Sequence, residues 1–309
     1  MSCDFPIAGY RKADFNVSGK RSFQFSPIGS LSGIPEYLPC GKCIGCRLER
    51  ARIWATRCVH ESKMHKQNCF ITLTYDNAWL PSDGSLDVRH FQLFMKRLRV
   101  SLDRVAGIKL RFYACGEYGD LNKRPHYHAL LFGFDFPDKK FYSEGNGYKL
   151  YTSKILDGIW GYGDCKIGDL TFETAMYVAK YCLKKVDGAQ REAGHYLVYD
   201  IDGVVTERHP EFAVMSRRPG IGTPYYEMFG HEIRYHDSIV LNGREGPSIR
   251  YYDLKHEAID GHGFEKLKKG RRLEARSDFQ RFLVEKSSPR RLVKSMLKER
   301  RLREKARLL

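Results

Sequence analysis

The sequence lacks several features that define common classes of protein. No run approaches the roughly 18 apolar residues of a membrane-spanning helix, and the N-terminus MSCDFPIAGYRKADF has no apolar signal segment. We therefore expect no membrane partner and a protein that stays in a cytoplasm. No GxxxxGK[ST] loop occurs, so nothing supports an NTP-driven motor. Internal repeats and low-complexity segments are also absent.

Acidic residues are too few to balance the basic ones. The 309 residues include 53 Lys and Arg against 37 Asp and Glu, a formal net charge of +16. This charge indicates a polyanionic partner, nucleic acid before a membrane surface. Residues 265–309 alone hold 17 Lys and Arg against 6 Asp and Glu. We expect this tail to be helical and to grip DNA non-specifically; a solvated surface helix is the alternative.

Nine cysteines are an odd number, and the stretch CGKCIGC spaces three of them too closely for a secreted disulfide framework. We expect reduced thiols. One interpretation is a structural Zn²⁺ ion with three thiolate ligands from this stretch, Cys40, Cys43 and Cys46. Cys58 is the expected fourth ligand, with His60 or Cys69 as alternatives. An iron-sulfur cluster also suits the spacing, and buried thiols without a metal are a third interpretation.

Residue patterning predicts an alternation of strands and helices. Strands are expected at residues 69–76, 109–119 and 126–134 because of their β-branched and aromatic content. The last two should form an antiparallel hairpin. Helices are expected at residues 47–65, 86–102 and 169–185. The second of these is amphipathic and should pack on the sheet.

The hairpin gives a shared face to three possible metal ligands. Side chains alternate along a strand, so His126 and His128 lie on one face and Tyr127 on the other. Glu117 is expected opposite His126, or opposite His128 if the pairing shifts by two residues. Two imidazoles and a carboxylate form a three-ligand site with open positions for water or phosphate. Half-exposed histidines without a metal are the alternative.

The helix at 169–185 carries the second group of functional residues. It should begin at Asp169 or Thr171, and Tyr177 and Tyr181 stand four residues apart on one face. The lysines on or beside that face are Lys180, Lys184 and Lys185. A tyrosine that attacks a phosphodiester must lose a proton with an ordinary pKa near 10, and nearby cations favour that loss.

Together these motifs resemble the HUH endonucleases, the initiators of rolling-circle replication. The matching stretches are FITLTYD, RPHYHALLFG and YVAKYCLKK, in this order. His126 and His128 match the histidine pair of the metal motif, and Tyr177 with Lys180 matches Y-x-x-K. CGKCIGCRLER, GEYG and MSRRPGIG look closer still to the initiators of gokushoviruses, single-stranded DNA phages of the Microviridae.

The resemblance implies a fold and a mechanism. The fold is α+β, a central antiparallel sheet flanked by helices, here with a Cys-rich N-terminal extension and a basic helical tail. Mg²⁺ or Mn²⁺ on His126, His128 and Glu117 would polarise the scissile phosphate of single-stranded or supercoiled phage origin DNA. Tyr177 or Tyr181 would attack it and form a 5'-phosphotyrosine link. The free 3'-OH would prime a host polymerase, with a host helicase as a further partner, in the host bacterial cytoplasm.

The sequence divides into four predicted parts. They are an N-terminal extension (1–66), a catalytic core (67–190), an accessory region packed on the core (191–264) and the basic tail (265–309). The residues predicted to contact DNA are Arg124, Lys185, Arg217 and Arg218.

Two rival functions stand against the endonuclease. A histidine-triad nucleotide hydrolase would need a third histidine at position 130, which is Leu130. The other rival is a non-catalytic, zinc-containing DNA-binding regulator, and a nicking assay on single-stranded DNA separates it from the endonuclease.

Overall fold

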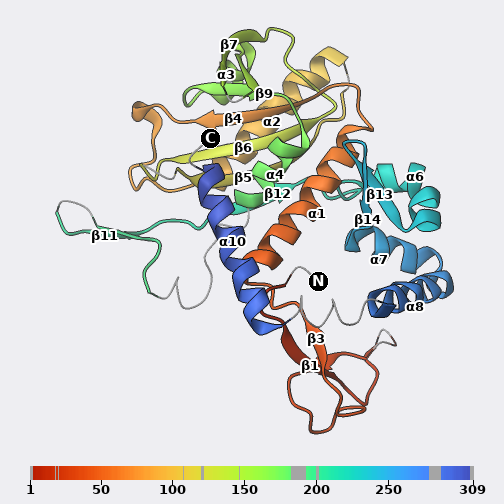
Figure 1. Ribbon diagram of the computed structural model, residues 1–309. Coiled ribbons are helices and arrows are strands. Elements are labelled where there is room, and N and C mark those ends of the chain that lie inside the picture. The colour runs from red at the N-terminus through yellow and green to blue at the C-terminus, as the bar shows by residue number, and fades with distance from the viewer. Residues whose placement is uncertain are drawn as a thin grey trace. The chain divides into compact units, whose positions relative to one another are not determined.

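Figure 1 shows the fold as a computed structural model of the chain. The structure describes residues 3–17, 19, 21–106, 108–119, 122–145, 147–181, 193–199, 202–277 and 287–306. At helix positions 104–106, 181, 275–277 and 302–306 it describes the backbone alone. The chain forms two compact units, one of residues 51–265 and one of residues 1–50 with 266–309.

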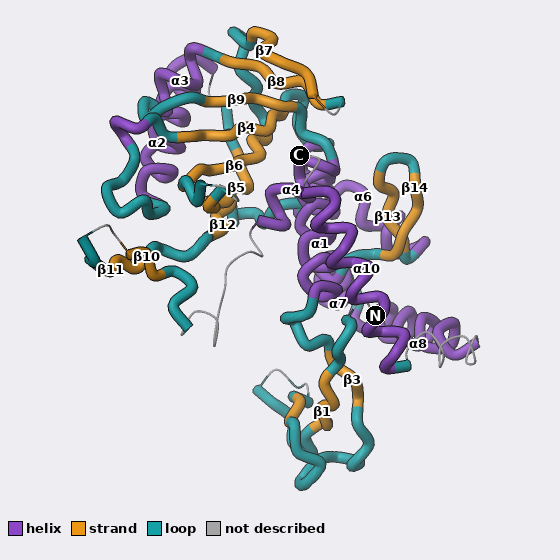
Figure 2. Tube along the Cα trace, turned by 60° about the vertical axis from the view of Figure 1, so that its left-hand side comes forward, coloured by secondary structure: helices purple, strands orange, loops and turns teal. Residues whose placement is uncertain are grey.

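A seven-stranded antiparallel sheet is the centre of the larger unit. Its strand order is β12-β5-β6-β4-β9-β8-β7, and Figure 2 shows these strands side by side. The strands are β4 (Asn68–Thr74), β5 (Arg111–Tyr118), β6 (Pro125–Phe132), β7 (Lys140–Gly145), β8 (Tyr148–Thr152), β9 (Cys165–Gly168) and β12 (Phe212–Met215). The strands predicted at 69–76, 109–119 and 126–134 are confirmed as β4, β5 and β6, next to one another in the sheet.

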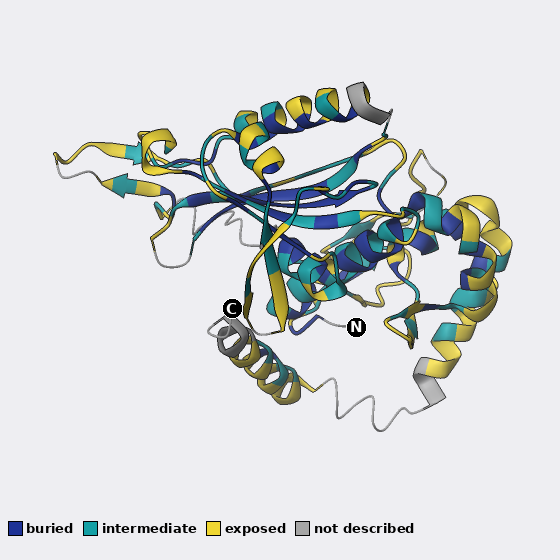
Figure 3. Cartoon of the chain, turned by 90° about the horizontal axis from the view of Figure 1, so that it is seen from above, coloured by how far each residue is buried: buried dark blue, intermediate teal, exposed yellow. Residues whose placement is uncertain are grey.

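Helices cover both faces of this sheet, as the predicted α+β fold requires. The helices that contribute to the larger unit are α1 (Ile44–Ser62), α2 (Val88–Ala106), α3 (Lys154–Trp160), α4 (Phe172–Tyr181), α6 (Thr223–His236) and α7 (Arg250–Ile259), with a short 3-10 helix η1 (Asn77–Trp79). In Figure 3 the strands of the sheet are largely dark blue, while the helices carry exposed residues on their outer sides.

The two faces of β6 belong to two different cores. Tyr127 and Leu131 pack with the apolar residues of α2 and α3. Leu130 and Phe132 pack with those of α1 and α4. A buried side chain of this size contributes about 1.5–3 kcal/mol, so both helical layers are held firmly on the sheet. Because His128 alternates with Tyr127, it faces the α1 and α4 layer.

Helix α4 begins at a pair of reciprocal hydrogen bonds. The Thr174 amide donates to Thr171 Oγ1 at 3.2 Å, and the Thr171 amide donates to Thr174 Oγ1 at 2.8 Å. Thr171 also accepts the first helical backbone bond, from Ala175 at 3.0 Å. Of the two predicted start residues, Thr171 is therefore the N-cap. Residues 182–192 lie outside the described part of the chain.

Helix α1 is fixed to β5 through the buried carboxylate of Glu61. This carboxylate accepts hydrogen bonds from Arg111 Nε at the start of β5 and from the Gly222 amide at 2.6 Å. His65 Nε2 lies 3.4 Å from the same group. Burial alone would raise the pKa of Glu61, but the hydrogen bonds of His65 and Gly222 and the charge of Arg111 hold it below its ordinary value.

The region predicted as accessory contributes to the sheet itself. β12 pairs with β5, with Phe212 opposite Gly116, and forms the edge of the sheet. β13 (Ser238–Leu241) and β14 (Arg244–Pro247) form the predicted hairpin around Asn242 and Gly243. Both turn residues have positive φ, at 50° and 72°, as the tightest hairpin turns need. A further hairpin joins β10 (Leu197–Tyr199) to β11 (Val205–Glu207).

The smaller unit pairs the N-terminal segment with the C-terminal helices. Its sheet has the order β2-β1-β3, formed by β1 (Ile7–Arg11), β2 (Phe23–Gln24) and β3 (Glu36–Leu38). The predicted helical tail is described as α8 (Gly261–Ser277), most of which lies in this unit, and α10 (Ser288–Ala306).

Candidate active site

The site is built on the β5–β6 hairpin, at the end where the two strands are joined. Glu117 pairs directly with His126, the first of the two predicted registers. His126 Nε2 lies 2.9 Å from Glu117 Oε1, and His128 Nε2 lies 3.0 Å from the same oxygen. One ligand atom from each residue lies within 4.8 Å of the others, so the group could hold a metal ion. The predicted convergence of these three side chains is thus present in the structure.

The outer nitrogen of each imidazole has its own partner. His126 Nδ1 lies 3.1 Å from the carbonyl oxygen of Arg124, and His128 Nδ1 lies 3.0 Å from Thr72 Oγ1 on β4. A carbonyl oxygen can only accept, so Nδ1 of His126 carries a proton and its Nε2 is directed at the carboxylate. Such outer contacts fix the orientation of metal-binding histidines. Sequence reasoning missed Thr72, although the pairing of Thr72 with His128 across β4 and β6 would have identified it.

Burial and hydrogen bonding act in opposite directions on the carboxylate of this site. Glu117 is 1% exposed and His128 4% exposed. Burial alone would raise the pKa of Glu117, but the hydrogen bonds and charges of His126 and His128 hold it below its ordinary value. The carboxylate therefore stays ionised, which is the form that binds a cation.

Helix α4 brings Tyr177 against the histidine pair. Its ring lies 5.1 Å from that of His128, nearly perpendicular at 83°. Phe70 on β4 contacts both rings, stacked on His128 at 5.5 Å and edge-on to Tyr177 at 6.3 Å. Tyr177 is half-buried, as is Lys180 one turn further along the helix. The structure therefore unites Tyr177 with the histidines, as the motif order predicted.

Other predicted residues of this helix are only partly described. Tyr181 lies at the last described position of α4, where the backbone alone is described. Lys184 and Lys185 lie outside the described residues. Their predicted roles stay predictions.

Arg124 has contacts within its own chain. Its guanidinium donates to Asn77 Oδ1 at 2.6 Å and to the Tyr75 carbonyl at 2.7 Å. These bonds hold the end of the hairpin beside the segment after β4, and Arg124 also supplies the carbonyl that orients His126. Its contribution to the site is positioning, and the predicted DNA contact remains untested.

Arg217 and Arg218 are exposed in the loop after β12, at the other end of the sheet. The amide of Ser216 donates to the Phe112 carbonyl, and Phe112 is five residues before Glu117 on β5. Five residues of strand span about 17 Å, so these arginines are not part of the metal-binding group. A DNA contact by them would lie away from the histidine pair.

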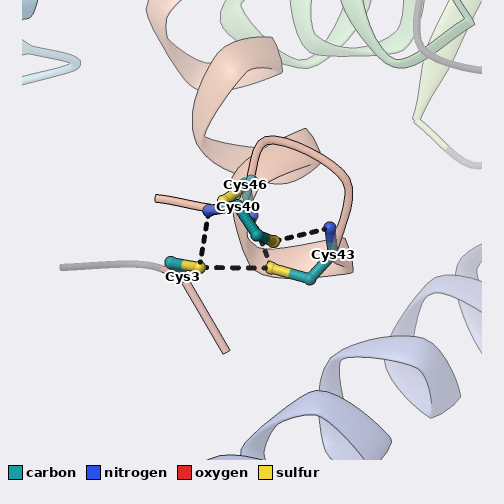
Figure 4. A group of neighbouring side chains, drawn as sticks. All are labelled: Cys3, Cys40, Cys43 and Cys46. Atoms are coloured by element: carbon teal, nitrogen blue, oxygen red, sulfur yellow. Dashed lines mark hydrogen bonds between the residues drawn. The ribbon is translucent and has the colours of Figure 1, made fainter. Parts of the chain in front are cut away.

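The second possible metal group differs from the predicted one in its fourth residue. It consists of Cys3, Cys40, Cys43 and Cys46 (Figure 4). Cys58 is instead fully buried in the core shared by α1 and α4. Cys46 and Cys58 are twelve residues apart on one helix, about 18 Å along its axis, too far to share an ion. The prediction of Cys58 as fourth ligand was therefore wrong.

Comparison with known proteins places this site in a family. Residues 68–186, which include the hairpin and α4, match the family model of the replication-associated protein ORF2. The architecture and site are thus those of a protein associated with DNA replication.

Relatives extend the match over most of the chain. The replication-associated protein VP4 of Bdellovibrio phage phiMH2K is 36% identical over 258 residues, 82% of this chain and 76% of the relative. The replication-associated protein ORF2 of Spiroplasma virus 4 is 31% identical over 268 residues, 82% of this chain and 79% of the relative. The chain therefore belongs to the family of phage replication-associated proteins, and the predicted resemblance to phage initiators is confirmed.

Two further findings bear on the class of the protein. No solved structure gives a significant match to this chain. Within the described part of the chain, no helix is both long and apolar enough to cross a membrane.

Proposed function

We propose that this protein is a replication initiator that nicks single-stranded phage origin DNA with a tyrosine nucleophile and later rejoins the ends. The observation that carries the proposal is the contact of Tyr177 with His128, in a group of three convergent metal-ligand side chains. Membership in the replication-associated family supports it. A nucleophile beside such a group is the arrangement that phosphodiester cleavage needs.

The residues present fit a divalent cation. Glu117, His126 and His128 offer one oxygen and two nitrogens, and the contact of Nδ1 with the Arg124 carbonyl leaves Nε2 of His126 directed inward. A mixed set with open positions suits Mg²⁺ or Mn²⁺. When bound, the cation offsets negative charge on the scissile phosphate.

The chain's own residues supply the rest of the chemistry. Tyr177 Oη attacks the phosphorus; the bond from tyrosine to phosphorus forms as the bond from phosphorus to the 3' oxygen breaks. The phenol loses its proton and the 3' oxygen gains one, which leaves a free 3'-OH and a 5'-phosphotyrosine link. One phosphodiester replaces another, so no ATP is needed. Lys180, on the same face of α4, offsets charge near the phenolate.

A second nucleophile would complete the cycle. Tyr181 follows Tyr177 by four residues on α4, so the two positions share one face of the helix. With the first DNA end held on one tyrosine, the other can cut the regenerated origin, and the two ends can then be joined. A host polymerase would extend the free 3'-OH, and a host helicase would open the duplex.

The test is adduct formation with end-labelled single-stranded DNA of the phage origin. We expect a denaturation-resistant protein band for the wild type and for Tyr177→Phe and Tyr181→Phe, with cut-and-join impaired in each single variant. The double variant should form no adduct. Tyr235→Phe is the matched control, because Tyr235 is 79% exposed on α6 and keeps its hydroxyl in solvent.

The histidines are tested in the same assay. His126→Ala and His128→Ala should abolish cleavage while single-stranded DNA binding persists, because the ligands are lost but the basic surfaces remain. An adduct in the double tyrosine variant would place the nucleophile elsewhere. A wild type that binds DNA but never cuts it, with or without Mg²⁺ or Mn²⁺, would favour the non-catalytic regulator.

A further inference from the structure

The N-terminal segment has almost no apolar interior of its own. Among the described residues from 3 to 50, the only buried side chains of the hydrophobic class are those of Cys3 and Cys46. Large apolar side chains are instead exposed, including Phe5, Phe15 and Phe25. A segment of this size with so little buried surface needs another source of stability, such as a disulfide or a metal ion.

Strand pairing and a helix start bring four cysteines of this segment together. β1 pairs with β3, with Ile7 opposite Leu38, so Cys3 and Cys40 lie just beyond the same end of that pair. Cys43 directly precedes α1, and Cys46 lies in its first turn. Figure 4 shows the four side chains gathered at this point.

The sulfur positions match one tetrahedral ion. Four sulfurs at about 2.3 Å from one Zn²⁺ lie about 3.8 Å from each other. The Sγ atoms of Cys3 and Cys43 are 3.8 Å apart, and all four Sγ atoms lie within 4.8 Å of one another. A disulfide would need about 2.05 Å, and these cysteines are not in disulfides. An iron-sulfur cluster would separate the thiolates further, because several iron atoms lie between them.

Backbone amides are directed at the sulfur atoms. The Cys40 amide donates to Cys3 Sγ at 3.3 Å, and the Cys43 amide donates to Cys40 Sγ at 3.3 Å. Cys43 Sγ accepts from the amides of Asp4 at 3.3 Å and Cys46 at 3.5 Å. Such bonds reduce the repulsion among thiolates that share one cation, and they orient the ligands before it binds.

The same group is linked to the C-terminal helix of its unit. Asp4, next to Cys3, is 3% exposed. Its Oδ2 accepts from the Gly45 amide at 2.9 Å, in the first turn of α1, and its Oδ1 accepts from Lys298 Nζ on α10. The carboxylate therefore joins the cysteine group to a helix with eight Lys and Arg.

We propose that Cys3, Cys40, Cys43 and Cys46 hold one structural Zn²⁺ ion, which orders the N-terminal segment and, through Asp4, anchors the basic helix α10. The site is separate from the residues proposed to cleave DNA and does not depend on that function. Because Cys3 is the fourth ligand, the ion closes the segment from its first described residue to the start of α1.

The first experiment measures the ion directly in the full chain purified without a metal-affinity tag. We expect about one tightly bound zinc per chain in wild type and in the Tyr177→Phe, Tyr181→Phe double variant. Substitution of Co²⁺ should give the intense near-ultraviolet thiolate-to-metal band of a tetrathiolate site, which a histidine-carboxylate site cannot produce. Cys3→Ser should weaken this band and lower zinc content, whereas the matched control Cys58→Ala should keep both.

The second experiment keeps the test informative if a cysteine variant fails to fold. Zinc is displaced from folded wild type with a mercurial reagent, and amide hydrogen exchange is followed in α10, with α7 as internal control. Faster exchange in α10 alone supports the anchoring role. A thiolate band retained by Cys3→Ser, a chain without thiolate-bound zinc, or an iron-sulfur absorption spectrum would overturn the site. Unchanged exchange in α10 after zinc release would overturn the anchoring.

Discussion

Replacement of Thr72 by valine is expected to weaken divalent-ion binding while leaving the fold intact. Thr72 Oγ1 is the partner of His128 Nδ1, at 3.0 Å, and valine has nearly the same shape without the hydroxyl. The substitution leaves Glu117, His126 and His128 in place. It removes only the hydrogen bond that sets the direction of the His128 ring.

The magnitude follows from what that hydrogen bond does. Loss of an outer partner of a metal-binding histidine lowers metal affinity about 10–100-fold, which is about 1.4–2.7 kcal/mol. The effect on the free energy of unfolding should be smaller, about 0.5–1.5 kcal/mol, because Thr72 is only half-buried and a single hydrogen bond is removed. Metal binding should therefore suffer more than stability.

Thr74 provides a control on the same strand and the same face. Its Oγ1 donates to the Asp164 carbonyl at 2.7 Å, away from the imidazoles. Mn²⁺ binding, measured by electron paramagnetic resonance without DNA, should be weakened in Thr72→Val and near wild type in Thr74→Val. Nicking by Thr72→Val should recover at high Mn²⁺. Equal Mn²⁺ affinity in the two variants would refute the orienting role of Thr72.

Three further outcomes are expected. Glu61→Gln should lower the free energy of unfolding at pH 7 by about 3 kcal/mol, because Arg111 loses the charge of its partner; urea unfolding measures this, with the exposed Glu232→Gln as control. Since the pKa of Glu61 lies below its ordinary 4.5, its stabilisation is complete above about pH 4.5 and is lost as the pH falls through the folded-state value, so the difference between wild type and variant should shrink in acid. Removal of residues 265–309 should lower DNA affinity and reduce the salt slope by about 0.7 for each phosphate that the protein no longer binds, and an unchanged slope in a binding titration would assign the tail another role. Thr171→Ala should cost about 1 kcal/mol in thermal unfolding through loss of the α4 cap, with nicking by Tyr177 retained; no change in stability would contradict the capping role.

The parts of the site that sequence predicted best depend on local pairing. The β5–β6 hairpin has a short connection, so side-chain alternation was enough to place Glu117 with His126 and His128. The hairpin at Asn242 and Gly243 was predicted for the same reason, since these residues favour positive φ.

The parts that sequence missed depend on contacts between distant segments. Cys3 reaches Cys40 only because β1 pairs with β3, and those short strands carry little periodic signal. β12 has four residues and lies at a sheet edge, so its pairing with β5 left no pattern to detect. Thr72 became a partner of His128 only through the register of β4 on β6.

The position of the three convergent ligands in one short stretch of chain has a consequence for the order of folding. Residues 117 to 128 need to close only a small loop to meet, and hairpins of this kind form within about 1–10 μs in isolation. Tyr177 arrives separately, when its helix packs on a sheet assembled from many strands. A nascent or partly melted chain could therefore already capture a divalent ion while its nucleophile is still remote. We expect such a chain to be harmless to DNA, because cutting ability appears last.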